Sequence, residues 1–272
     1  MKASHLLRVN RALRTLAIFG ACCFSTILQG DIQEKLPMEQ KLHLIQENKN
    51  NSSELSKLLP IVHSSFTPSP YERVLMTRLR DQNTSMQDFR QTASKLAGLL
   101  IGKVVAVLDL QPVAITTPLT DTEGLSIASN VNLVSIMRSG DALLETFGSY
   151  FPEATISKIL IQRDEETAKP IFKYMKLSSS IGPDATVVIT EPLIATGGTL
   201  SVAIDLLKQK GVAEENIIIA SICTAPEGLL VLSEKFPKVK VVMVVMDDHL
   251  NERKYIVPGL GDFGDRFFGT VH

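Results

Sequence analysis

Short apolar runs alternate with amphipathic segments from about residue 131 to residue 246. The runs predict strands over 131–137, 156–162, 185–190, 216–223 and 239–246, and the intervening segments predict helices over 141–150, 200–210 and 227–235. Runs such as 241–245 lack polar alternation, so both faces of these strands should be covered. The pattern therefore predicts an α/β fold with a central, mainly parallel sheet flanked by helices.

The residues before this region predict a smaller set of elements. Helical spacing of apolar residues indicates helices over 71–79 and 84–101, the second opened by the capping-box pattern Thr84-Ser85-Met86-Gln87. Two strands, over 104–108 and 113–117, are expected to form a small hairpin arm around Gln111-Pro112. The charged stretch 163–176 is expected to be a loop.

The N-terminal region has a different composition. Four basic residues precede an apolar run over 15–28, which is the layout of a secretory signal and is too short for a stable membrane span. Alternatives are an organelle transit peptide, a lipoprotein signal ending at Cys22, or an untranslated extension with Met38 as the start. We therefore divide the chain into a signal-like or untranslated extension (1–30), a polar linker or peripheral segment (31–65) and a main domain (66–272).

Composition narrows the function classes. The 272 residues carry a formal net charge of −1 and a 44% hydrophobic fraction, as expected of a globular protein, and no basic stripe with interleaved aromatic residues predicts nucleic-acid binding. The cysteines at 22, 23 and 223 have neither the spacing of a metal site nor that of a disulfide framework. No metal held by protein ligands alone is predicted.

Residues 187–200 carry the clearest chemical pattern. A strand runs into Glu191, and Ala195-Thr196-Gly197-Gly198-Thr199 then opens a helix. A glycine-rich turn at a helix N-terminus directs backbone N–H groups and partial positive charge at one centre, which favours a phosphate. An ordinary glycine-rich β–α turn is the alternative.

Other polar residues fall at the ends of predicted strands. Arg138, Arg163 and Glu191 each follow one, which places them on the carboxyl edge of the sheet, where ligands bind in such folds. The tail 255–265 combines three glycines and two aspartates with interleaved apolar residues, so we expect a rigid loop packed on the core.

Together these stretches resemble the uracil phosphoribosyltransferases, which have the type I phosphoribosyltransferase fold. The resemblance covers about 71–272. Its most specific parts are Glu191-Pro-x-x-Ala-Thr-Gly-Gly198 and the run from Pro258 to Asp265, and further similarity lies in Ile136–Gly140, Arg163–Thr167 and Ala225-Pro-Glu-Gly228.

The resemblance implies a pyrimidine-salvage reaction in which uracil and 5-phospho-α-D-ribose 1-diphosphate (PRPP) give UMP and pyrophosphate, with Mg²⁺ held mainly through PRPP. Catalytic roles fall to Arg138, Glu191 and Asp262. The residues implied to bind PRPP are Arg138, Ser139, Gly140, Arg163, Glu191, Pro192, Leu193, Ile194, Ala195, Thr196, Gly197, Gly198, Thr199 and Asp262. Those implied to bind uracil are Ile256, Gly261, Asp262 and Phe263, largely through backbone groups. A homo-oligomer, a nucleotide effector such as GTP and a cytoplasmic location are also implied.

Five residues depart from the family pattern, among them Val104, which stands where an alanine is usual. Glu191 replaces aspartate, Ser139 replaces alanine, Lys254 replaces a glycine and Lys103 replaces a glutamate. An alternative function is therefore a catalytically weak or inactive protein on the same fold that binds nucleotide or PRPP as a regulator.

Overall fold

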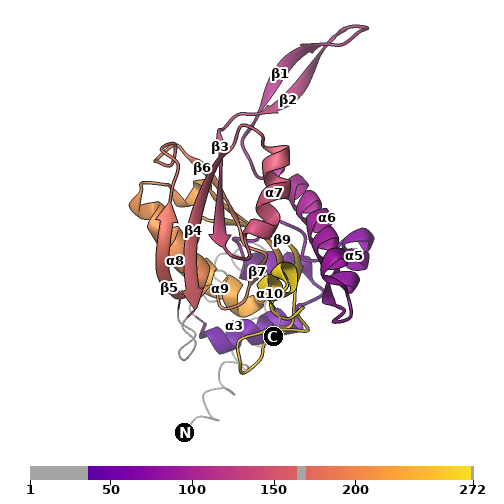
Figure 1. Cartoon of the computed structure of the whole chain (residues 1–272), viewed down its shortest axis with the longest axis vertical. Helices are drawn as coiled ribbons and strands as arrows, with labels where there is room; N and C mark the ends of the chain where they lie inside the picture. Colours follow the sequence, from indigo (N-terminus) through magenta and orange to yellow (C-terminus); the bar gives the residue numbers. More distant parts are fainter. Residues whose placement is uncertain (1–35, 164–169, 271–272) are drawn as a thin grey trace, which may run out of the picture. The chain divides into compact units, whose positions relative to one another are not determined.

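The computed structural model describes residues 36–163 and 170–270 (Figure 1). The chain divides into two units, 1–41 and 42–272. Of the first unit, only residues 36–41 are described, and they contain the start of helix α3 (Met38–Glu47). The signal-like segment 1–30 lies outside the described residues. All further elements belong to the second unit.

A seven-stranded sheet forms the centre of the second unit. Its strands follow the order β5-β4-β3-β6-β8-β9, with β7 pairing with β8 beyond the end of β6. Their bounds are β3 (Val131–Met137), β4 (Thr155–Arg163), β5 (Pro170–Lys176), β6 (Thr186–Thr190), β7 (Leu193–Ile194), β8 (Ile217–Thr224) and β9 (Lys240–Met246). All neighbours pair in parallel except β4 and β5. The expected mainly parallel sheet is confirmed.

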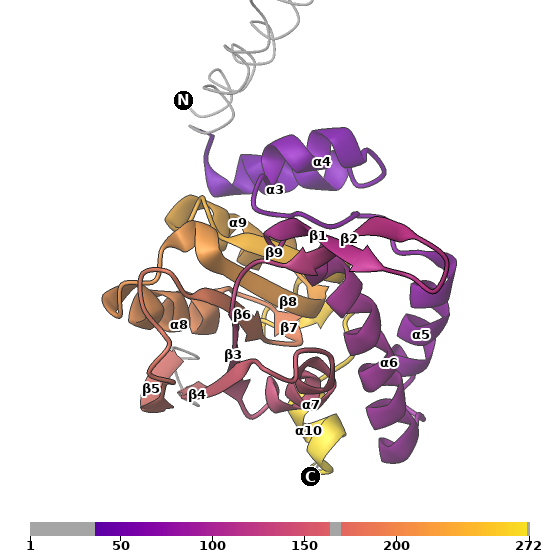
Figure 2. The same cartoon turned by 90° about the horizontal axis from the view of Figure 1, so that it is seen from above.

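The continuous apolar runs explain the position of this sheet. Every residue of β6 and of β8 is buried. Helices α5 (Pro70–Arg80), α6 (Met86–Val105) and α7 (Asp141–Tyr150) cover one face, and α8 (Gly198–Gln209) and α9 (Pro226–Lys235) cover the other (Figure 2). The strand order reverses between β3 and β6, so the loops that follow these two strands flank the switch point.

The hairpin arm differs from its prediction. Its strands are β1 (Leu110–Thr116) and β2 (Asp121–Ile127), which pair antiparallel and project from the body of the unit (Figure 1). The predicted strand over 104–108 is wrong, because α6 continues to Val105. Leu96, Leu100 and Val104 are all fully buried at helical spacing, and this packing outweighs the preference of β-branched valines for strands.

Three other local predictions need correction. The start of α6 is capped by Ser85, whose Oγ accepts a hydrogen bond from the Asp88 N–H at 3.1 Å, one residue later than the predicted box. The expected loop 163–176 contains β5, an edge strand with largely exposed side chains. The expected loop 255–265 contains β11 (Ile256–Val257), which pairs with β10 (His249–Leu250), and the start of α10 (Phe263–Phe268).

Residues 42–65 are more closely packed than a polar linker. Helix α4 (Ser52–Leu58) buries Leu55, and the following Leu59 and Ile61 are also buried. The chain then runs beside β9, with a parallel bridge between Val62 and Val241. The few apolar residues in this polar stretch are thus the ones that attach it to the sheet.

Lys103 has a partner that the sequence did not indicate. Its Nζ lies 2.7 Å from Glu72 Oε1 and donates to the Met243 carbonyl at 2.9 Å, which ties α5, α6 and β9 together. Burial alone would raise the pKa of Glu72, but the hydrogen bonds from Lys103 and Ser69 outweigh it and lower that pKa. The lysine at position 103, which departs from the family pattern, therefore has a structural role in an ion pair with Glu72.

Replacing Lys103 with methionine is expected to lower the free energy of unfolding by about 2–3 kcal/mol. The change leaves a buried carboxylate without its cation, a loss that costs about 3–5 kcal/mol in full burial and less here because Lys103 is partly exposed. Urea denaturation measures the loss. The double variant Lys103→Met with Glu72→Gln should regain part of it, and equal stability of the single variant and the wild type would contradict the expectation.

Candidate active site

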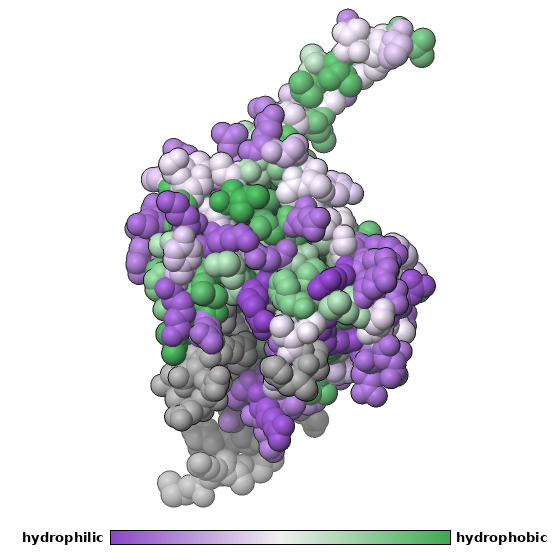
Figure 3. Space-filling model, in the orientation of Figure 1, coloured by the Kyte–Doolittle hydropathy of each residue, from purple (hydrophilic) through white to green (hydrophobic). Residues whose placement is uncertain are grey.

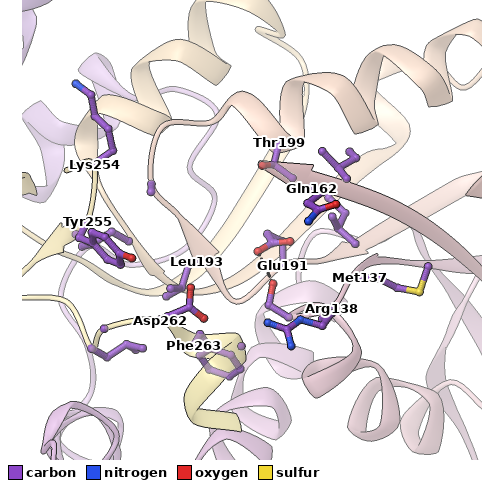
Figure 4. A pocket seen from close by; sticks show the side chains of 18 of the residues that line it. Met137, Arg138, Gln162, Glu191, Leu193, Thr199, Lys254, Tyr255, Asp262 and Phe263 are labelled. Atoms are coloured by element: carbon purple, nitrogen blue, oxygen red, sulfur yellow. Dashed lines mark hydrogen bonds between the residues drawn. The ribbon is translucent and has the colours of Figure 1, made fainter. Parts of the chain in front are cut away.

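Loops from three parts of the chain line one cavity at the carboxyl edge of the sheet. The cavity has a volume of about 640 Å³. Its walls come from the loop after β3, the region from the end of β6 to the start of α8, and the segment between β10 and α10, with the end of β4 beside them (Figure 4). The first two flank the switch point, so the site lies where this kind of sheet opens for a ligand.

The loop after β3 presents a cation and a hydroxyl. Arg138 donates from Nη2 to Asp265 Oδ1 at 3.0 Å and from Nη1 to Thr270 Oγ1 at 3.3 Å, so its guanidinium faces the C-terminal segment. Asp265 thus pairs with Arg138 across 127 positions of sequence. The Ser139 Oγ donates to Glu191 Oε1 at 3.0 Å, which joins this loop to the next one.

Gly140 has a packing role in this loop. Its N–H donates to the Ile136 carbonyl at 2.9 Å, and it does not line the cavity. A Cβ at this position would come 2.3 Å from the Thr190 carbonyl oxygen. Glycine is therefore required because the β3 loop passes directly against the end of β6.

Glu191 lies where the strand pairing with β8 is interrupted between β6 and β7. Strand β6 pairs with β8 as far as Thr190, and β7 resumes the pairing at Leu193. Between them, the Glu191 N–H donates to the Ala220 carbonyl at 3.2 Å, so the backbone is fixed while the side chain is directed into the cavity. The side chain is only 8% exposed. Figure 4 shows it between Thr199 and Arg138.

The glycine-rich turn leads into α8 as predicted. Gly197 is the N-cap residue with φ of 74°, a left-handed conformation that glycine adopts without strain. Gly197 has no side chain to cap α8, and the Thr196 Oγ1 accepts a long hydrogen bond of 3.4 Å from the Gly198 N–H. The first N–H groups of a helix have no partner within it, so the start of α8 can bind an anion. Thr199 and Ala195 line the cavity beside it.

The C-terminal wall combines a buried aromatic ring, a glycine and a carboxylate. Phe263 is 1% exposed, and its ring packs edge-on against Phe89 with centroids 5.2 Å apart. Gly261 lies beside it with φ of 82°. Asp262 caps α10, with Oδ1 accepting from the Asp265 N–H at 2.8 Å. A ligand at this wall would therefore meet backbone groups and the Asp262 carboxylate.

The structure brings most of the predicted residues to the cavity. Those that line it are Arg138, Ser139, Glu191, Leu193, Ala195, Thr199, Ile256, Gly261, Asp262 and Phe263. Those that do not are Gly140, Pro192, Ile194, Thr196, Gly197 and Gly198. Arg163 ends β4, next to β3 in the sheet, but its side chain lies outside the described part of the chain.

Sequence reasoning missed several lining residues. They are Ile136, Met137, Leu160, Ile161, Gln162, Arg253, Lys254, Tyr255, Leu260 and Gly264. For Gln162 a signal existed, because it sits at the carboxyl end of a predicted strand. For Lys254 the signal was that it replaces a glycine of the family pattern. Its φ of 64° is left-handed, a conformation that favours glycine.

Replacing Lys254 with glycine is expected to raise the free energy of unfolding by about 0.5–1 kcal/mol. A side chain costs roughly 1–2 kcal/mol in the left-handed region, and the greater freedom of glycine in the unfolded chain cancels part of that gain. Thermal or urea unfolding measures the change. Lys254→Ala removes the charge but keeps the Cβ, so a gain of the same size in that variant would show that backbone strain is not the cause.

A family model and the curated relatives agree on one family. The family model of uracil phosphoribosyltransferase matches residues 66–270. A uracil phosphoribosyltransferase from Dictyostelium discoideum is 42% identical over 197 residues, covering 72% of this chain and 91% of that protein. Another from Salinibacter ruber is 42% identical over 195 residues, covering 72% of this chain and 91% of that protein. The solved structure of the AQ2163 protein from Aquifex aeolicus superposes with a TM-score of 0.68 at 29% identity, covering 76% of this chain and 97% of that one.

Proposed function

Because the chain belongs to the uracil phosphoribosyltransferase family, we propose that it transfers the phosphoribosyl group of PRPP to uracil, giving UMP and pyrophosphate. The observation that carries this function is the convergence of the three loops on one cavity. A cation after β3, a carboxylate and a helix start after β6, and the wall before α10 correspond to pyrophosphate, ribose phosphate and base.

The phosphate groups of PRPP are assigned to the two loops at the switch point. The start of α8 and Thr199 bind the 5′-phosphate, because this helix end offers N–H groups and partial positive charge. Arg138 binds the pyrophosphate, on which negative charge develops as the bond to the ribose breaks. A fixed donor aimed at developing charge is commonly the largest catalytic contribution. Arg163, from the neighbouring strand end, is a second cation for the same group.

The ribose and the base are assigned to the remaining walls. Glu191 accepts hydrogen bonds from the ribose hydroxyls, with its orientation supported by Ser139. Uracil lies against Ile256 and Gly261–Phe263, where the buried Phe263 ring leaves backbone groups to recognise the base. Asp262 faces both substrates. Groups fixed for the uracil edge would leave a cytosine donor unpaired, so cytosine should be rejected.

The donor set of the cavity suits a PRPP-bound Mg²⁺. Glu191 and Asp262 supply carboxylate oxygens, and the described residues hold no cluster of three or more histidine, cysteine or acidic side chains that would form a protein-only metal site. Mg²⁺ commonly binds through one or two carboxylates together with substrate phosphates and water. When bound, the ion neutralises charge on the leaving pyrophosphate.

Formation of UMP from uracil and PRPP in the presence of Mg²⁺ tests this function. We expect the product with uracil and at most a trace with cytosine. The alternative is a regulator that binds PRPP or nucleotide without turnover. It would show PRPP binding by calorimetry and no UMP, and that result would overturn the enzymatic function.

A second copy of this chain is the partner that we propose for the hairpin arm. Apolar side chains lie exposed along it (Figure 3), including Leu119 at 95% and Leu125 at 70% exposure. A two-stranded hairpin is marginally stable alone, and exposed apolar groups favour association. Sedimentation equilibrium should show a dimer or larger oligomer, and a monomer at micromolar concentration would contradict the proposal.

Activation by a nucleotide such as GTP is a further proposal that rests on the family alone. Rates of UMP formation at subsaturating PRPP with and without GTP test it. An unchanged rate and unchanged oligomeric state would contradict it.

For the location of the protein we propose the cytoplasm, where PRPP is made. No helix within 36–163 or 170–270 is long and apolar enough to cross a membrane. The signal-like segment 1–30 leaves export or organelle targeting as alternatives. Mass spectrometry of the mature N-terminus decides between them, and a lipid on Cys22 or Cys23 would contradict a cytoplasmic location.

A further inference from the structure

The loop before α10 is held by an ion pair that does not line the cavity. Arg80, the last residue of α5, donates from Nη1 to Asp247 Oδ2 at 2.7 Å and from Nη2 to Asp247 Oδ1 at 2.5 Å. The same pair binds both backbone groups of Gly259. Arg80 Nη1 donates to the Gly259 carbonyl at 2.7 Å, and the Gly259 N–H donates to Asp247 Oδ2 at 2.8 Å. The result is a closed ring of hydrogen bonds.

The surroundings of Asp247 keep this pair charged and fixed. Asp247 directly follows β9 and is 4% exposed. Burial alone would raise its pKa, but the hydrogen bonds and charge of Arg80 outweigh burial and lower it. The Cys223 thiol donates to Oδ2 at 3.2 Å, and burial beside this carboxylate raises the pKa of that thiol well above its ordinary value. The carboxylate is therefore charged and fully occupied by donors at neutral pH.

A second arginine, Arg266, binds the backbone of the next loop residue, Leu260. Arg266 Nη1 donates to the Leu260 carbonyl and to the Leu79 carbonyl, both at 2.7 Å. Its guanidinium lies over the Phe89 ring, with Cζ 4.4 Å from the ring centroid. Leu260, Gly261 and Asp262 line the cavity immediately after Gly259, so a shift of one residue would move the wall that faces the base.

Two glycines leave part of this loop with little conformational preference of its own. Gly259 and Gly261 have φ of 59° and 82°, and glycine reaches such conformations and many others at similar cost. Recognition through backbone groups requires the backbone to be fixed before the ligand binds, because the entropy cost of ordering it is otherwise paid from binding. Contacts from other parts of the chain supply this order, the Arg80–Asp247 pair at Gly259 and Arg266 at Leu260.

We propose that Arg80 and Asp247 are positioning residues that set the affinity for the base by fixing Gly259 and the wall that follows it. The proposal rests on the proposed function for the identity of the base. It assigns to these two residues no contact with substrate and no part in the chemistry of PRPP.

Two variants and one matched control test this role. Asp247→Asn keeps the shape and removes the charge, and Arg80→Lys keeps a positive charge but cannot bond Asp247 twice and Gly259 as well. Lys103→Met is the control, because it breaks another buried ion pair at α5 without touching the loop. For each protein, kcat and the KM values for uracil and PRPP are measured below the unfolding transition. Hydrogen exchange at the Gly259 and Leu260 amides is followed in the same samples.

We expect KM for uracil to rise about tenfold in Asp247→Asn and less in Arg80→Lys. KM for PRPP should rise by a clearly smaller factor, because only Asp262 among the groups assigned to PRPP lies on this wall. Exchange at the two amides should be faster in both variants. Lys103→Met should lose stability and keep both the uracil KM and the amide protection. If Asp247→Asn does not fold, Arg80→Lys and the control decide by the same readouts.

Two results would overturn the proposal. One is a similar rise of the uracil KM in Lys103→Met, which would make general destabilisation the cause. The other is unchanged amide protection in both loop variants. Failure of the proposed function is distinguishable from both results, because the wild-type protein would then form no UMP. In that case hydrogen exchange at Gly259 and Leu260 still tests whether Arg80 and Asp247 fix the loop.

Discussion

Replacing Arg138 with methionine is expected to lower kcat/KM for PRPP by about 100- to 1,000-fold, the range found when one fixed donor to a developing anion is removed. The side chain lines the cavity at the switch point and is aligned by Asp265 at 3.0 Å. Because methionine keeps the length of the stem and loses the charge, binding of the leaving pyrophosphate should fail while the fold persists. Steady-state formation of UMP measures the loss.

Arg90→Met is the matched control for this variant. Arg90 lies over the Phe267 ring at 5.6 Å, much as Arg138 lies over Phe268 at 5.9 Å, and both reach the C-terminal segment. Arg90 donates to the Phe267 carbonyl at 2.7 Å and does not line the cavity. Its loss should leave kcat/KM nearly unchanged. A comparable decrease in both variants would mean that packing of this segment, and not the charge of Arg138, is responsible.

Glu191→Gln is the second substitution with a large expected effect, a decrease of about 100-fold in kcat/KM for PRPP. Hydrogen bonds to a charged group contribute about 1.5–3 kcal/mol each, and two ribose hydroxyls would lose a charged acceptor. The amide oxygen of glutamine can still accept from Ser139, so the free energy of unfolding should hardly change. Initial rates over a range of PRPP concentrations measure the effect.

Ser139→Ala separates the role of the acid from its support. If Ser139 only orients Glu191, its loss should cost much less than the loss of the acid itself. Unchanged kinetics in Glu191→Gln would show that this carboxylate does not bind the ribose, and the extra methylene relative to aspartate would then be the first feature to reconsider.

The sheet could be predicted from the sequence because burial on both faces leaves a simple signal. Strand β8 is fully buried, and its apolar run marked it to within one residue at each end. Helix α7 matches its predicted range of 141–150. These elements are governed by local periodicity, which the chain displays directly. The glycine-rich turn and Arg138 could be predicted for a similar reason, since each follows a recognisable strand.

The missed features depend on distant residues or on exposure. Strand β5 has exposed, partly charged side chains and pairs only at the sheet edge, so its sequence resembles a loop. Lys103 departs from the family pattern, and its partner Glu72 could not be inferred before α5 and α6 were seen packed together. The bonds from Arg80 to Asp247 and Gly259 join residues more than 160 positions apart.

The glycine-rich start of α8 links the folding of this chain to its substrate. Glycine at an N-cap costs only about a few tenths of a kcal/mol relative to serine or aspartate, and beyond the 3.4 Å bond from the Gly198 N–H to Thr196 Oγ1 the first N–H groups of α8 have no partner within the helix. A phosphate bound there would complete the helix only while it remains bound, and any ligand that prefers the folded state adds to its stability by mass action. The supply of PRPP would then affect the stability of the protein as well as its catalytic rate. Protein without bound PRPP would unfold more readily than protein with it.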